Sequence, residues 1–174
     1  MRTLWDREMS AEVALLGDIS PARRIKLVSD VIDDTVASLP DAGQDLLTGE
    51  AGAAVEAAIR AIHAAVGGSS EDEPADELFD ELLELAEDVD VMPLWQLFMG
   101  LSYCVAVVPM KIGVGTTEEV LSALYDTVRD CQDLPEFPVG TAEDVVLAVE
   151  SANDRCVASI ARQKTLIREA ADQG

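Results

Sequence analysis

The 174-residue sequence has few of the side chains that carry most enzyme chemistry: one histidine, three cysteines and 4% aromatic residues. A Ser–His or Cys–His nucleophile system, or a histidine-rich metal site, would depend on His63 alone, which we interpret as a structural residue. The Glu-x-x-His pairs of di-iron bundles and the alternating acids of a calcium loop are both missing. The sequence therefore predicts no catalytic residue, no metal site and no cofactor, and the protein is not expected to be an enzyme.

Basic residues are also scarce, because 12 Lys and Arg stand against 34 Asp and Glu and the formal net charge is −22. Direct binding to nucleic-acid phosphates needs a surplus of positive charge, which displaces counterions. This composition argues against a protein that binds DNA or RNA directly.

The three cysteines are too few and too widely spaced for the disulfide framework of a secreted domain. Charged residues at positions 6 to 8 interrupt the apolar stretch that a signal peptide would need. Nine Arg against three Lys, with frequent Ala, Val and Asp, is typical of a GC-rich bacterial genome. We therefore expect a cytoplasmic bacterial protein.

What the chain does have is enough apolar residues for one core: 49% of them are hydrophobic and the mean hydropathy is +0.16. Helix boundaries are the clearest positive signal. Thr3 precedes a periodic run over 4–16, Ser20 and Pro21 open a second helix that runs to residue 39, and Gly67 follows a small-residue helix.

Two further segments resemble capping boxes, in which a threonine and an acid three residues later cap a helix start: 116–119 and 141–144. The second would open a last helix of up to about thirty residues, which is roughly 45 Å long. No alternating strand pattern is present. We predict an all-α, single-domain bundle of about seven helices over residues 1–174, with a long C-terminal helix and a mobile acidic linker near 67–74.

Residues 91–110 carry no charge, and about twenty apolar residues are enough to cross a bilayer. Pro93, Gln96, Gly100 and other breaks interrupt the run, and no basic cluster flanks it. We predict a central buried helix here and no membrane span.

The acids are unevenly distributed: residues 27–110 contain 18 acids and one base, Arg60. Over residues 76–88 leucines recur at helical spacing and acids take the opposite side. A field of this kind steers a basic partner to the surface and repels nucleic acid, although solubility alone is an alternative role. The predicted partner-binding residues are Asp76, Glu77, Asp80, Glu81, Glu84 and Glu87 of this helix, with Glu71, Asp72 and Glu73 before it.

In size, charge and predicted helical content the chain resembles the small acidic all-helical immunity proteins of bacterial toxin systems. That resemblance implies a protein that binds a cognate toxin, for example a nuclease, and occludes its basic substrate groove. Through segments 78–108 and 155–170 the chain is also similar to the YjaG-like helical family of unknown function, which implies no activity.

Two alternatives stay open. One is a small helical enzyme or ligand-binding protein whose pocket lies beneath the 91–110 helix and is lined by Trp95, Tyr103 and Cys104. The other is an oligomeric structural module, in which the leucine-rich face of residues 78–85 packs against a second copy.

Overall fold

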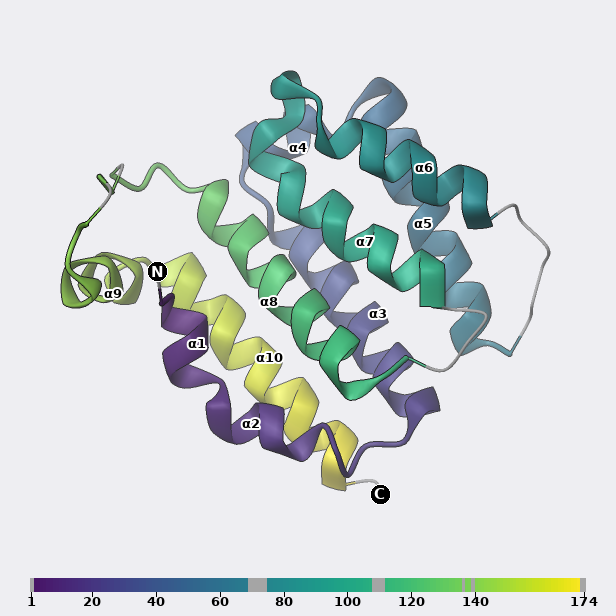
Figure 1. Cartoon of the computed structure of the whole chain (residues 1–174), viewed down its shortest axis with the longest axis horizontal. Helices are drawn as coiled ribbons and strands as arrows, with labels where there is room; N and C mark the ends of the chain where they lie inside the picture. The colour runs from purple at the N-terminus through teal and green to yellow at the C-terminus, as the bar shows by residue number, and fades with distance from the viewer. Residues whose placement is uncertain (1, 69–74, 108–111, 136, 139, 173–174) are drawn as a thin grey trace.

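The computed structural model describes residues 2–68, 75–107, 112–135, 137–138 and 140–172, and in these ranges it contains ten α-helices, one 3-10 helix and no strand (Figure 1). In chain order the elements are α1 (Leu4–Glu8), α2 (Ser10–Leu15), α3 (Pro21–Ser38), α4 (Asp41–Leu46), α5 (Gly49–Val66), α6 (Ala75–Ala86), η1 (Val89–Leu94), α7 (Trp95–Val107), α8 (Val114–Asp130), α9 (Glu143–Ser151) and α10 (Asp154–Asp172). The predicted all-α class is confirmed. The described part of the chain holds more helices than the seven or so that were expected.

The extra helices arise partly because two predicted helices are each broken in two. The first breaks at Met9, between α1 and α2. The last breaks before Asn153, whose side-chain oxygen accepts hydrogen bonds of 3.0 Å from the backbone N–H groups of Arg155 and Cys156. An asparagine that caps backbone amides in this way starts a new helix. The expected thirty-residue helix is therefore wrong, and α10 has 19 residues.

The predicted caps at Thr3, at Ser20 with Pro21 and at Gly67 are confirmed as the start of α1, the start of α3 and the end of α5. Thr3 and Asp6 form a complete capping box before α1. The box predicted at 116–119 is wrong, because α8 begins three residues earlier, at Val114, and has Gly113 as its N-cap. The box predicted at 141–144 is also wrong: α9 follows Ala142 without a side-chain cap, and the Thr141 hydroxyl donates to the Pro138 carbonyl at 2.7 Å.

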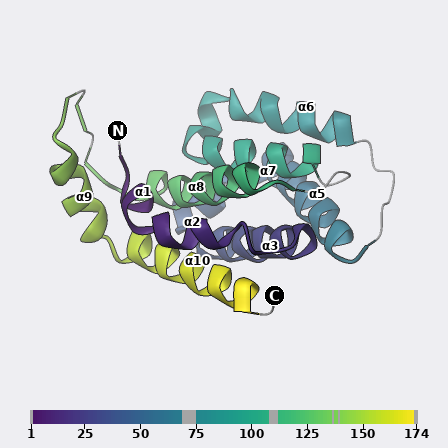
Figure 2. The same ribbon diagram turned by 60° about the horizontal axis from the view of Figure 1, so that its bottom comes forward.

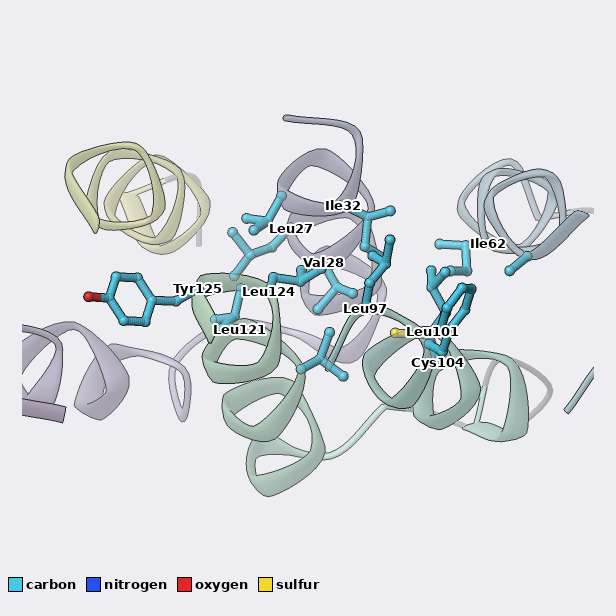
Figure 3. Packing of buried hydrophobic residues seen from close by; sticks show 14 of the residues in the cluster. Leu27, Val28, Ile32, Ile62, Leu97, Leu101, Cys104, Leu121, Leu124 and Tyr125 are labelled. Atoms are coloured by element: carbon cyan, nitrogen blue, oxygen red, sulfur yellow. The ribbon is translucent and has the colours of Figure 1, made fainter. Parts of the chain in front are cut away.

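The core lies where α3, α5, α7 and α8 meet. Figure 2 shows α6 at one edge of the bundle, α7 and α8 beneath it, α3 further down and α10 at the opposite edge. Figure 3 shows core side chains of four helices at close range, namely Leu27, Val28 and Ile32 of α3, Ile62 of α5, Leu97, Leu101 and Cys104 of α7, and Leu121, Leu124 and Tyr125 of α8. All of them are almost fully buried.

The uncharged segment 91–110 begins within η1 and continues as α7, and its last three residues lie outside the described ranges. Leu94, Leu97, Phe98 and Leu101 are completely buried, so the predicted central buried helix is confirmed over the described part. In the described ranges no single helix has the length and apolar composition of a membrane span. One pair of helices, Asp76–Ala86 and Asp90–Ala106, has both when the two are taken together, but the pair is bent by 120°.

Candidate functional site

The six predicted acids at the α6 end of the bundle are all exposed. Helix α6 buries Leu82 completely and packs Leu78 and Leu85 against the core, which turns its charged side outward at the edge of the bundle (Figure 2). This is the arrangement that the amphipathic pattern predicts. We call Asp76, Glu77, Asp80, Glu81, Glu84 and Glu87 the acidic face; Glu71, Asp72 and Glu73 lie outside the described residues.

Within the described ranges, none of the ion pairs involves the acidic face. Helix α6 itself contains no basic residue, and Arg60 of neighbouring α5 contacts Glu56 of its own helix at 3.9 Å. Six carboxylates therefore face solvent with no described cation to neutralise them.

On the far side of the bundle, acids are paired with the cations of α10. Arg162 contacts Asp34 of α3, Arg168 contacts Glu12 of α2, and Lys164 contacts Glu8 of α1 at 3.2 Å. Hydrogen bonds from Lys164 and Arg7 hold the pKa of Glu8 below its ordinary value. These carboxylates tie helices together, and they are not available to a partner in the way that the acidic face is.

A groove of about 490 Å³ lies along α7 and α8 and ends at α1. Residues of three helices line it: Trp95, Gln96, Met99 and Tyr103 of α7, Gly115, Glu118, Glu119, Ser122, Ala123 and Asp126 of α8, and Trp5 and Asp6 of α1. We call this the aromatic–acidic groove. Helices α7 and α8 are in contact there: a Cβ on Gly100 would lie 3.5 Å from the Cβ of Ala123, an ordinary van der Waals distance.

The pocket residues expected from the sequence are only partly brought together. Trp95 and Tyr103 both line the groove and are 41% and 38% exposed. Cys104 does not line it, because its side chain is buried on the core side of α7 (Figure 3), where burial raises the pKa of the thiol to about 12. The predicted role of Cys104 in such a pocket is therefore wrong.

Sequence reasoning missed the acids of this groove. Glu118, Ser122 and Asp126 recur at intervals of four on α8, as Trp95, Met99 and Tyr103 do on α7, so each set forms a stripe on its helix. The sequence contains both stripes. Only the packing of α7 against α8 shows that they face the same groove.

A buried polar cluster lies at the α1 end of α8. Both Leu4 N–H and Tyr125 O–H donate to Glu150 Oε2, at 2.5 and 3.0 Å. The second oxygen, Oε1, has no hydrogen-bond partner and lies 3.9 Å from Arg129 Nη1. Burial is the main cause that raises the pKa of Tyr125. These contacts join α9, α1 and α8, which gives the cluster a structural role.

Asp126 connects this cluster to the groove. Its Oδ1 lies 2.8 Å from Arg129 Nη1, in contact as an ion pair but not aligned for a hydrogen bond. Burial raises the pKa of Asp126 to about 6, although Arg129 opposes the shift. In the part of the chain that the structure describes, no group of three or more His, Cys, Asp and Glu side chains is placed to hold a metal ion.

Comparison of the chain with protein-family models, curated proteins and solved structures finds no match. The acidic face and the aromatic–acidic groove are therefore the two features of the molecule that point to a function.

Proposed function

We propose that this protein binds a basic protein through the acidic face of α6. The observation that carries the proposal is a contrast in pairing: five exposed carboxylates on α6 and that of Glu87 just after it form no ion pair within the described ranges, while Glu8, Glu12 and Asp34 are paired with the cations of α10. An unpaired row on a helix anchored by buried leucines presents charge to solvent at fixed positions.

Charge of this kind acts mainly on association. A surface of one sign raises the encounter rate with an oppositely charged partner by about tenfold or more at low salt. It also rejects like-charged ligands, including nucleic acid. The net charge of −22 adds long-range attraction to the local contacts of the acidic face.

The narrower form of the proposal is that the partner is a bacterial toxin and that binding occludes its basic substrate groove. The resemblance to acidic helical immunity proteins supports this form, as does the fit between a carboxylate row and a groove that would otherwise hold phosphates. No chemical step by this protein is required, because the bound protein keeps the substrate out of the partner's groove.

The leucine-rich face of residues 78–85 offers no support for the oligomeric alternative. Leu82 is completely buried, and Leu78 and Leu85 pack against the chain's own core.

The test begins with affinity capture from host lysate at low and moderate salt, with the bound proteins identified by mass spectrometry. Association of the captured partner is then measured for the triple variant Asp80→Lys, Glu84→Lys and Glu87→Lys. We expect association to slow by about tenfold or more at low salt and to lose most of its salt dependence.

The matched control is Asp18→Lys, Asp154→Lys and Glu169→Lys, which changes the net charge equally at exposed acids away from α6. If the control slows association as much as the α6 variant does, total charge and not the acidic face explains binding. An α6 variant that associates like the wild type contradicts the proposal.

A further inference from the structure

The aromatic–acidic groove is distinctive because it holds a large share of the few aromatic side chains in this chain. The sequence has two Trp, two Tyr and three Phe, and three of these seven, Trp5, Trp95 and Tyr103, line the groove. Two of the three are substantially exposed, although burying them would stabilise the fold. An aromatic surface left open in a concave site is a feature of binding sites.

The charge of the groove restricts its occupant. The lining includes four carboxylates, from Asp6, Glu118, Glu119 and Asp126, and no lysine or arginine from the described residues. Arg129 contacts Asp126 at 2.8 Å and Thr3 holds Asp6 in the capping box of α1, so the carboxylates of Glu118 and Glu119 remain to meet a ligand. An anionic occupant would be repelled, and a neutral one would leave these charges uncompensated.

Aromatic faces and carboxylates together are suited to one kind of cation. A guanidinium is planar, so it stacks on an indole or phenol ring and at the same time presents paired N–H donors to a carboxylate. A lysine ammonium gains the charge attraction but not the stacking or the paired hydrogen bonds.

The position of the groove favours an arginine that belongs to a protein. Helix α7 packs against α6 on one side and α8 on the other (Figure 1), and because α7 also lines the groove, the groove begins on the helix next to α6. Helix axes in contact lie about 8 to 10 Å apart, and a partner surface of ordinary size, about 800 Å², is large enough to span that distance.

We propose that the aromatic–acidic groove receives an arginine side chain of the basic partner, which stacks on Trp95 and Tyr103 and pairs with Glu118 and Glu119. The inference rests on the proposed function for the source of the arginine. It assigns the acidic face to attraction of the partner and the groove to retention, since buried stacked contacts act mainly on dissociation.

The groove is tested first without the partner, using the full chain and three capped tripeptides, Gly-Arg-Gly, Gly-Lys-Gly and Gly-citrulline-Gly, at moderate salt. Both tryptophans of the chain line the groove, so intrinsic fluorescence reports its occupancy directly. We expect saturable binding of the arginine peptide, at least about threefold weaker binding of the lysine peptide, and no binding of the uncharged citrulline peptide.

Variants locate the binding. Tyr103→Leu and Glu119→Gln change exposed positions and keep both tryptophans, and each is expected to weaken the arginine peptide by about threefold to tenfold. The control Asp80→Asn, Glu84→Gln and Glu87→Gln removes three charges from α6 and should leave peptide affinity within about twofold, because the Debye length at physiological salt is about 8 Å. Far-ultraviolet circular dichroism checks that every variant is folded.

The two proposals fail in different ways. With the captured partner, the variants Tyr103→Leu and Glu119→Gln should speed dissociation at least about threefold and leave association unchanged, whereas charge reversal on α6 slows association. Equal binding of the citrulline peptide, or unchanged peptide affinity and dissociation in the groove variants, overturns the inference about the groove. Unchanged association in the α6 variant overturns the proposed function, even if the arginine peptide still binds.

Discussion

The α10 side and the α6 side of the bundle use the same acidic residue types in opposite ways. On the α10 side, Glu8, Glu12 and Asp34 are each paired with a cation that comes from a different helix. On the α6 side, in the described ranges, the acidic face has no cation at all within ion-pair distance. Among these nine acids, pairing with a cation separates the carboxylates that join helices from those that are available to a partner.

This comparison leads to a simple expectation. Acids on the paired side should matter for stability, and acids on the unpaired side should matter for binding. Four substitutions test it, in order of decreasing effect on the free energy of unfolding.

The largest effect is expected for Glu150→Ala. The substitution removes the acceptor of Leu4 N–H and Tyr125 O–H, leaves a cavity, and takes away a carboxylate close to Arg129. Buried donors without partners and broken buried charge pairs together predict a loss of about 3 to 4 kcal/mol, measured by urea unfolding. Glu150→Gln keeps an acceptor and should lose clearly less; equal losses would show that the hydrogen bonds contribute little.

The second effect depends on pH and concerns Asp126. Its pKa in the folded chain is raised to about 6, so between about pH 4 and 6 the folded state holds a proton that the unfolded chain has released. The carboxyl thus costs stability progressively as the pH rises through this window, and fully above it. Asp126→Asn removes that cost, and relative to the wild type it should gain on the order of 2 kcal/mol between pH 4 and pH 7.

The readout is the difference in unfolding free energy between variant and wild type at several pH values. Asp130→Asn, at the exposed neighbour that also pairs with Arg129, controls for a general loss of negative charge. A difference that stays constant from pH 4 to pH 7 contradicts the raised pKa.

A smaller loss is expected for Arg168→Ala, which leaves Glu12 without its cation. The Glu12 side chain is only 5% exposed, so an unpaired charge would remain in a poorly solvated position. We expect a loss of about 1 to 2 kcal/mol in thermal or urea unfolding, between the values for exposed and for buried pairs. Lys26→Ala, which breaks an exposed pair with Asp30, is the control and should cost about 0.5 kcal/mol or less.

The smallest effect on stability is expected for neutralisation of the acidic face, the surface on which binding of the partner is proposed to depend. Neutralising α6 with Asp80→Asn, Glu84→Gln and Glu87→Gln removes only exposed, unpaired charges. Stability should change by no more than about 0.5 kcal/mol, and a small gain is consistent with relief of repulsion between like charges. A loss comparable to that of Arg168→Ala would mean that the acidic face also supports the fold.

Local patterns predicted correctly which side of α6 is buried and which side is exposed. The leucines of α6 recur at helical spacing, so their burial and the exposure of the acids opposite follow from the period of the helix. The same reasoning placed Trp95 and Tyr103 on one side of α7. It failed for Cys104, because one further residue rotates the side chain by about 100° and turns it from the groove into the core.

Predictions failed where two local signals competed. Asn153 could continue a long helix or cap a new one, and its cap interrupted the run that apolar spacing suggested. The threonine at 116 could cap a helix only if no earlier residue did so, and Gly113 is earlier. Periodicity identifies helices reliably but does not rank the caps that end them.

The sequence by itself determined the helical class, the amphipathic α6 and the excess of acid, since all three depend on composition or on contacts within one helix. Only the tertiary structure decided which acids are neutralised, because Arg162, Lys164 and Arg168 find their partners on three other helices. It also decided that the stripes of α7 and α8 share one groove with α1. Such pairings join residues far apart in the chain, and they depend on packing that no local pattern encodes.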